Sequence, residues 1–146
     1  MIDKDEVLLE SIYNKIIIEN ADVKIKVIED DPVFDTRIKF QLNGSTLDVG
    51  KSSINRGMWG VAELFVPEEN RRQGIASKLL LAADNYIPSG YRSQVSNDSS
   101  VYLHYKVGFR SFNNDDEELS LEETLDKRKE WSSVMMVSPN FISGKK

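Results

Sequence analysis

The chain has 146 residues, no cysteine and a formal net charge of −5 at pH 7. The lack of cysteine excludes disulfides, thiolate metal sites and a cysteine nucleophile, and the acidic balance disfavours nucleic acid as a partner because phosphate binding needs a clustered basic surface. The length suits one domain, residues 1–146, and without an apolar run of ~18 residues or a signal-like start we expect a cytoplasmic protein that has no membrane contact.

The first third of the chain predicts one helix followed by strands. Residues 4–19 carry apolar residues at helical spacing, which predicts an amphipathic helix covering one face of a sheet. Residues 23–28 alternate in polarity and predict a strand. Two further strands, 33–42 and 45–49, meet at Asn43-Gly44, a strong hairpin signal. Residues 52–57 are expected to form a loop.

The remaining two thirds alternate between helices and strands. A half-buried strand over 59–67 leads into a helix from residue 75, and the pattern breaks over 86–90. A short strand over 91–96 precedes a helix that Asn97 or Asp98 can cap and Gly108 ends. We expect a further strand beginning over 109–112, a surface helix over 113–129, a closing strand over 131–137 that contains Met135 and Met136, and a loose tail over 138–146.

The turn between the strand at 59–67 and the following helix has the composition of an anion site. It reads Arg71-Arg72-Gln73-Gly74-Ile75-Ala76. The first turn of a helix leaves backbone N–H groups unpaired at the positive end of the helix dipole, and a glycine lets a ligand approach the backbone closely. This pattern favours a phosphate or diphosphate ligand, with ordinary packing as the alternative. The spacing matches neither a dinucleotide fingerprint nor a P-loop.

A second block, Asn97 to Phe109, adds a family resemblance. The first block resembles motif A, [Q/R]-x-x-G-x-[G/A], of the Gcn5-related N-acetyltransferase (GNAT) family, with Arg71, Gly74 and Ala76 at its fixed places. The second resembles the family's motif B, N-x-x-A-x-x-[L/F]-Y-x-K-x-G-F. The matching places hold Asn97, Ser100, Leu103, His104, Lys106, Gly108 and Phe109. Motif A spans about 58–85 and motif B about 91–112, in the family's order.

The resemblance implies a fold class and a ligand. The expected fold is α/β (α+β), a mixed, mostly antiparallel central sheet with flanking helices and splayed strands that form an acyl-CoA cleft. The expected co-substrate is acetyl-CoA, with no metal. The strand would bind the pantetheine arm through its backbone, the turn would bind the diphosphate, and motif B would touch the arm. The implied cofactor-binding residues are Leu64, Phe65, Val66, Arg71, Arg72, Gln73, Gly74, Ile75, Ala76, Ser77, Asn97 and Ser100.

The chain departs from the family pattern in two ways. The expected helix precedes all the strands, whereas family members place two helices after the first strand, so the family's acceptor pocket carries over poorly. His104, the only histidine, stands where the family has a tyrosine that protonates the departing thiolate, and Tyr105 follows one position later, rotated by about 100° on a helix. His104 is therefore a candidate catalytic acid, and a cofactor contact without proton transfer or a bystander are the alternatives.

The function implied by the resemblance is transfer of an acetyl group from acetyl-CoA to a primary amine by direct attack in a ternary complex. Glu63 is the candidate general base, with an outward-facing strand residue as the alternative, and Glu68 and Glu69 are expected to be solvated. The acceptor would be an amine-bearing small molecule or protein, weakly favoured as cationic by the acidic chain, and a homodimer is possible. The rival is a catalytically silent acyl-CoA-binding sensor or interaction module. A different phosphate-bearing ligand is a third possibility.

Overall fold

A computed structural model describes residues 23–29, 34, 36–51, 57–71 and 74–145. The helix expected over 4–19 and most of the loop expected over 52–57 lie outside these residues. The elements are β1 (Lys24–Glu29), β2 (Thr36–Leu42), β3 (Ser45–Lys51), β4 (Trp59–Phe65), the 3-10 helix η2 (Glu68–Asn70), α2 (Ile75–Tyr86), β5 (Arg92–Val95), α3 (Asp98–Lys106), α4 (Leu121–Trp131), β6 (Val134–Val137) and α5 (Pro139–Lys145).

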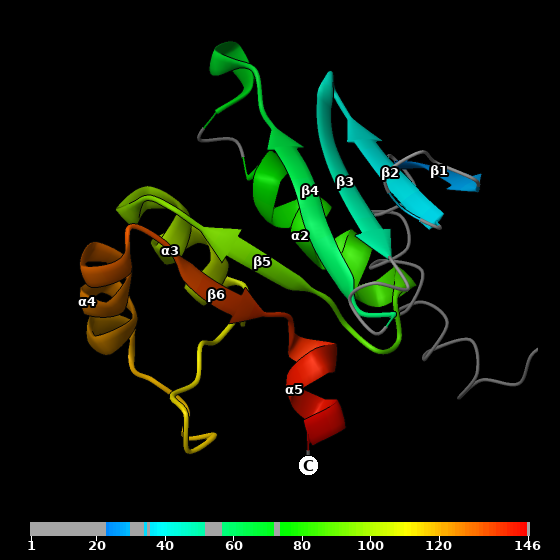
Figure 1. Ribbon diagram of the computed structural model, residues 1–146. Coiled ribbons are helices and arrows are strands. Elements are labelled where there is room, and N and C mark those ends of the chain that lie inside the picture. The colour runs from blue at the N-terminus through cyan, green and yellow to red at the C-terminus, as the bar shows by residue number, and fades with distance from the viewer. Residues whose placement is uncertain (1–22, 30–33, 35, 52–56, 72–73, 146) are drawn as a thin grey trace, which may run out of the picture.

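The strands form one open six-stranded sheet in the order β1-β2-β3-β4-β5-β6 (Figure 1). All neighbours are antiparallel except β4 and β5, which are parallel and share a single registered pair, Gly60 with Arg92. Beyond that pair the two strands diverge (Figure 1). A bulge also interrupts the β3–β4 ladder, because Asp48 pairs with Glu63 while Val49 pairs with Val61, which leaves Ala62 as the extra residue.

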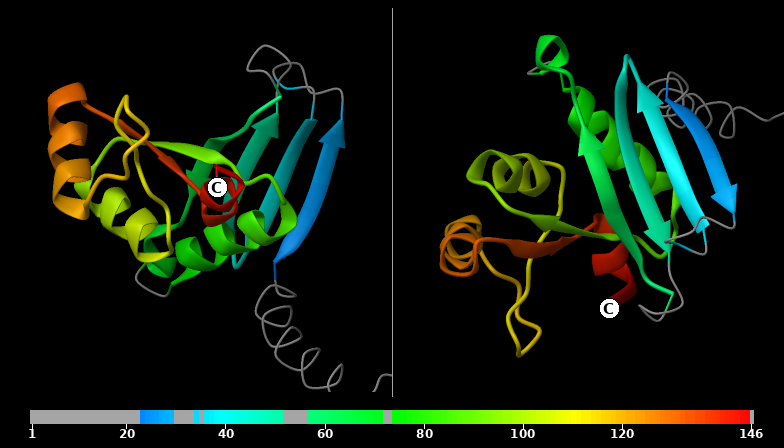
Figure 2. Two further views of the ribbon diagram at one scale, coloured as in Figure 1. Left: turned by 90° about the horizontal axis from the view of Figure 1, so that it is seen from below. Right: turned by 45° about the horizontal axis from the view of Figure 1, so that its top comes forward.

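The hydrophobic core lies between α2 and the β2–β3 hairpin. The alternating sequence of β2 directs its apolar side chains into this core. Ile38, Phe40 and Leu42 point to one face and are buried, while Gln41 is exposed. Leu79 and Leu80 of α2 are fully buried and belong to the same cluster. The expected mixed, mostly antiparallel sheet with flanking helices is therefore present, as Figure 2 shows from two further directions.

The C-terminal residues form a helix instead of the loose tail expected over 138–146, so that prediction is wrong. The backbone N–H of Asn140 donates to Asp84 Oδ1 at 3.0 Å, and its side-chain Nδ2 donates to Asp84 O at 2.7 Å, which ties α5 to α2. Tyr91 and Ser138 exchange two further hydrogen bonds, from Tyr91 N to Ser138 Oγ and from Ser138 N to Tyr91 O, both 2.9 Å. Burial raises the pKa of Asp84 above its usual value, although its bonds to Ser138 and Asn140 oppose this.

Other expectations need adjustment in the same region. Residues 109–112 make only isolated bridges, Arg110 to Val137 and Phe112 to Glu118, and form no strand. The helix expected over 113–129 begins only at Leu121, so its expected first part is wrong: Asn113 Oδ1 accepts from the backbone N–H groups of residues 115 and 117 and builds a turn there instead. Residue 131 ends α4 instead of opening β6.

Several other predictions are confirmed. They are the hairpin at 43–44, the strands near 23–28, 45–49 and 91–96, the helix after residue 74, and the placement of Met135 and Met136 in a strand.

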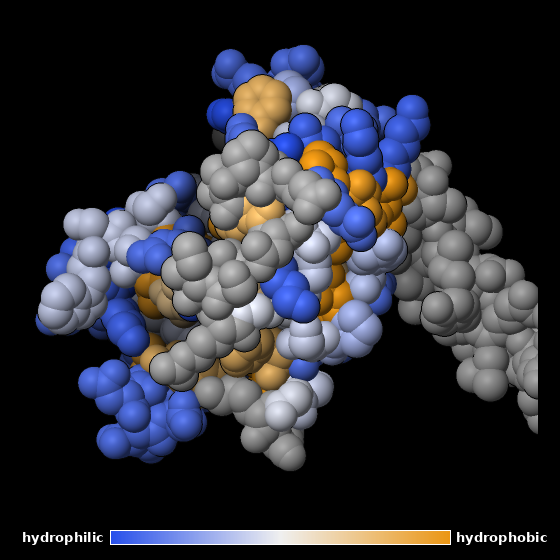
Figure 3. Space-filling model, turned by 45° about the vertical axis from the view of Figure 1, so that its right-hand side comes forward, coloured by the Kyte–Doolittle hydropathy of each residue, from blue (hydrophilic) through white to orange (hydrophobic). Residues whose placement is uncertain are grey.

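The edge strand β1 keeps two apolar side chains in contact with solvent. Ile25 and Val27 are 41% and 46% exposed, although their cross-strand partners Phe40 and Ile38 are buried. Figure 3 shows apolar patches among hydrophilic side chains on the side of the molecule turned toward the viewer there. Among the described residues, none of the helices is both long and apolar enough to cross a bilayer.

Candidate functional site

A cleft of about 720 Å³ opens where β4 and β5 part. It lies beyond the carboxyl end of β4, the place at which open α/β sheets commonly bind ligands. Three segments supply its walls: the end of β4, the first turn of α2 with the residues before it, and α3. The lining residues are Leu64, Val66, Arg71, Gly74, Ile75, Ala76, Ser77, Asn97, Ser99, Ser100, Leu103 and Lys106.

The floor of the cleft is the N-terminus of α2. Gly74 is the N-cap residue and has φ +74°, in the left-handed region that glycine adopts without strain. A Cβ built on Gly74 would meet nothing within 4 Å, so the backbone there is open. The first helical hydrogen bond runs from Lys78 N to Gly74 O at 3.0 Å. The amides of residues 75–77 precede it and have no partner within the helix, so they can serve an anion.

Two cationic side chains line the same cleft from different elements. Arg71 donates from Nε to Val66 O at 3.2 Å, which holds the turn against the end of β4. Lys106 comes from the last turn of α3 and is exposed. The cleft therefore has positive charge at two places although the chain is acidic overall. Arg72 and Gln73, also expected at this site, lie outside the described residues.

The α3 wall begins with a side-chain cap. Asn97 Oδ1 accepts from Ser100 N at 2.8 Å, so the capping predicted for Asn97 is confirmed. Because this bond orients the amide group, the Nδ2 donors of Asn97 remain for a ligand or water. Ser99, Leu103 and Lys106 also line the cleft, and sequence reasoning missed them as site residues. They follow the helical spacing i, i+4, i+7, which would have found them once Asn97 and Ser100 were assigned to that face.

His104 does not line this cleft. Its side chain is 2% exposed, Nδ1 lies 2.7 Å from Ser100 O and Nε2 lies 3.0 Å from Ser93 Oγ. Burial lowers the pKa of His104 below its usual value, and the contact with the Ser100 carbonyl opposes this. The predicted role as catalytic acid needs a ring nitrogen that reaches the ligand, whereas both nitrogens here are engaged within the fold. This geometry favours the alternative in which His104 transfers no proton to the ligand.

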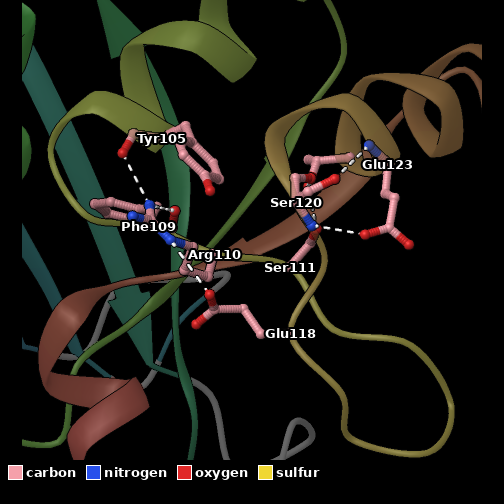
Figure 4. Close-up of polar contacts among 8 residues, drawn as sticks. Tyr105, Phe109, Arg110, Ser111, Glu118, Ser120 and Glu123 are labelled. Carbon is pink, nitrogen blue, oxygen red and sulfur yellow. Dashed lines mark hydrogen bonds and ion pairs between the residues drawn. The ribbon is translucent and has the colours of Figure 1, made fainter.

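Tyr105 lies outside the cleft wall as well. Its ring packs under the guanidinium of Arg110, with Cζ 3.7 Å from the ring centroid (Figure 4). Arg110 Nη1 also donates to the carbonyls of Tyr105 and Phe109, at 2.9 and 2.7 Å, and so closes the C-terminus of α3. Tyr105 therefore does not occupy the place at which the family resemblance implies a tyrosine, in agreement with the 100° rotation.

The candidate base Glu63 lies on β4 at the bulge and is exposed. It is not among the residues that line the cleft. Its cross-strand neighbour Asp48 is buried, and Asp48 Oδ1 makes no hydrogen bond to the described part of the chain. Phe65 is 49% exposed and also does not line the cleft, because successive strand residues point to opposite faces. Glu68 and Glu69 are exposed in η2.

Comparison of the chain with models of protein families, with curated proteins and with solved structures gave no match.

Proposed function

We propose that the cleft binds acetyl-CoA and that the protein transfers the acetyl group to a primary amine. The observation that carries this proposal is the continuity of two binding surfaces. The edge of β4 beyond Gly60 has no registered partner in β5, and the chain then leads to the open N-terminus of α2. A ligand with an extended, amide-bearing arm and a diphosphate matches both surfaces at once.

The diphosphate end is supported by charge and by backbone donors. The free amides of residues 75–77 and the positive end of the α2 dipole favour an anion, and Gly74 leaves room for it. Arg71 and Lys106 add two cations, which suits a ligand that has a diphosphate and a further phosphate.

The edge of β4 and the residues of α3 support the proposal that the cleft also binds the extended arm of the ligand. An extended arm can add to the free edge of β4 through backbone hydrogen bonds, as peptides do at sheet edges. Leu64 and Val66 give that end of the cleft an apolar wall. Asn97 and Ser100 stand opposite with polar atoms that can bond to the amides of the arm or to bridging water.

In the proposed reaction the neutral amine attacks the thioester carbonyl, a C–N bond forms, and the C–S bond of the tetrahedral intermediate breaks. A backbone N–H of β4 near the bulge stabilises the developing oxyanion. Glu63 lies on β4 outside the cleft lining, so it takes the amine proton through water. The buried carboxylate of its cross-strand neighbour Asp48 makes this region suited to a cationic acceptor. The thiolate takes a proton from solvent, since a thiol with a pKa near 8.5 is mostly protonated at neutral pH, so the reaction needs no proton from His104.

A second candidate, an acyl-CoA-binding protein without catalysis, is favoured by the burial of His104. The cleft would then keep its anion site and its strand edge while lacking a proton donor at the place where the family has one.

The test combines binding and turnover. Acetyl-CoA is titrated into the protein by calorimetry, and release of free thiol is then followed with a panel of primary amines. Binding with thiol release supports the acetyltransferase, and binding without release on any amine supports the silent binder. A wild-type protein that does not bind acetyl-CoA contradicts both.

Gly74→Asn tests the location of the site. Asparagine tolerates the left-handed conformation best among residues with a Cβ, so the variant adds a side chain to the cleft with little backbone strain. We expect acetyl-CoA affinity to fall at least about tenfold. The matched control is Gly44→Asn, at φ +77° in the β2–β3 turn and away from the cleft, which should bind normally. Equal affinity in both variants would place the ligand elsewhere.

A further inference from the structure

His104 joins α3, which forms one wall of the cleft, to the neighbouring strand β5. It belongs to α3 and its ring reaches Ser93 on β5, while its other nitrogen returns to the first turn of its own helix at Ser100. Nδ1 also lies 3.3 Å from Ser100 Oγ. The ring of Phe109 packs edge-on against it, with centroids 5.0 Å apart. The imidazole is thus enclosed by contacts with the protein and is 2% exposed.

The partners determine which nitrogen carries the proton. A carbonyl oxygen can only accept, so Nδ1 must be the donor to Ser100 O at 2.7 Å. In the neutral ring Nε2 then has a lone pair, and the Ser93 hydroxyl donates to it at 3.0 Å. The ring therefore bridges β5 and α3 as the Nδ1–H tautomer.

The carbonyl that His104 holds belongs to a residue of the cleft wall. Ser100 receives the Asn97 cap at its amide and the His104 ring at its carbonyl, so both ends of this residue are fixed by side chains. Ser100, Asn97 and the intervening Ser99 all line the cleft. We infer that His104 is a positioning residue, which locks the first turn of α3 against β5 and so sets the polar wall that faces the ligand. The part of this inference that concerns a ligand rests on the proposed function.

Three substitutions separate the two hydrogen bonds. His104→Asn places an amide nitrogen near the position of Nδ1 and can keep the bond to Ser100 O. His104→Gln extends to the position of Nε2 and can keep the bond to Ser93. His104→Leu keeps much of the apolar volume and loses both bonds. The asparagine and glutamine variants keep the inference testable even if the leucine variant does not fold.

The first readout requires no ligand. Hydrogen exchange of the Val101 amide, bonded to Asn97 O at 3.1 Å, reports on the first turn of α3. The Thr124 amide, bonded to Ser120 O at 2.9 Å at the equivalent place of α4, is the matched control. We expect exchange at Val101 relative to Thr124 to rise at least about fivefold in the leucine variant, because about fivefold is the loss expected for one buried hydrogen bond and this variant loses two. The rise should be smaller in the other two variants, which each keep one of the bonds. Nitrogen NMR of the wild-type imidazole should show the proton on Nδ1.

An unchanged ratio of exchange rates in all folded variants, or a proton on Nε2, would overturn the inference. The second readout is acetyl-CoA affinity, which should weaken several-fold in the asparagine and glutamine variants while the bound complex still turns over. Unchanged affinity with about a hundredfold loss of turnover would instead identify a proton donor and overturn the positioning role. If the wild-type protein does not bind acetyl-CoA, the proposed function fails, and the exchange ratio and the tautomer alone decide the role of His104.

Discussion

Gly90 stands where the turn after α2 meets α5, and replacing it with alanine tests how that helix is held. Gly90 has φ +74°, and its amide donates to Ile87 O at 2.9 Å. A Cβ at this position would overlap the backbone nitrogen of Phe141 and lie 2.7 Å from its Cα. The obstacle is backbone, which no rotamer change relieves, so α5 must move away.

The expected loss of stability in Gly90→Ala follows from comparison with Gly74. Gly74 also has φ +74°, but the space around its Cβ position is open. Gly74→Ala costs only the left-handed strain, about 1–2 kcal/mol, partly offset by the lower entropy of the unfolded chain. Gly90→Ala adds the displacement of α5. That movement strains the two bonds from Asn140 to Asp84 and the bond from Ser138 N to Tyr91 O, at about 1 kcal/mol each.

We therefore expect Gly90→Ala to lower the free energy of unfolding by about 2–3 kcal/mol more than Gly74→Ala does. Urea denaturation followed by circular dichroism measures both variants, and their difference removes the shared strain and entropy terms. Equal destabilisation of the two variants would refute the docking of α5 against Gly90, because the two glycines share a backbone conformation and differ in what surrounds them.

Three further predictions concern stability. Burial lowers the folded-state pKa of His104, so below about pH 6.5 the unfolded chain binds more protons, and stability present above that pH is lost as the pH falls, at no more than about 1.4 kcal/mol per pH unit. Urea denaturation between pH 7.5 and about 5.5 should show this loss in the wild-type protein relative to His104→Gln; the same pH dependence in both proteins would contradict the buried, neutral ring. Ser120→Ala removes the capping box with Glu123 and should cost about 1 kcal/mol in the same assay; no loss would mean that the cap is redundant. Tyr91→Phe removes a buried hydroxyl that donates to Leu80 O at 2.6 Å, and should cost about 1–2 kcal/mol; an unchanged midpoint would contradict that bond.

Much of the secondary structure could be predicted because its causes are local. Alternation in β2 and the Asn43-Gly44 turn produce the hairpin, and Gly74 begins α2 where good helix formers follow it. The Asn97 cap needs only Ser100, three residues on. Each of these features depends on neighbours within a few positions, so the amino-acid order alone was sufficient to predict it. The same local patterns indicated the turn and the helix that now form two walls of the cleft.

The C-terminal helix α5, the opening of the cleft and the surroundings of His104 depend on contacts between residues far apart in the chain. α5 contains glycine and serine and is too short to be stable alone, so its helix forms because Asp84 and Tyr91 hold it in place. The divergence of β4 and β5 and the inclusion of Lys106 in the cleft wall require the packed sheet and helices. His104 shows the difference most clearly. Sequence determined its place on α3 from the caps and stops of that helix, but only the tertiary structure decided that Ser93, from another strand, occupies the ring nitrogen that a proton donor would need.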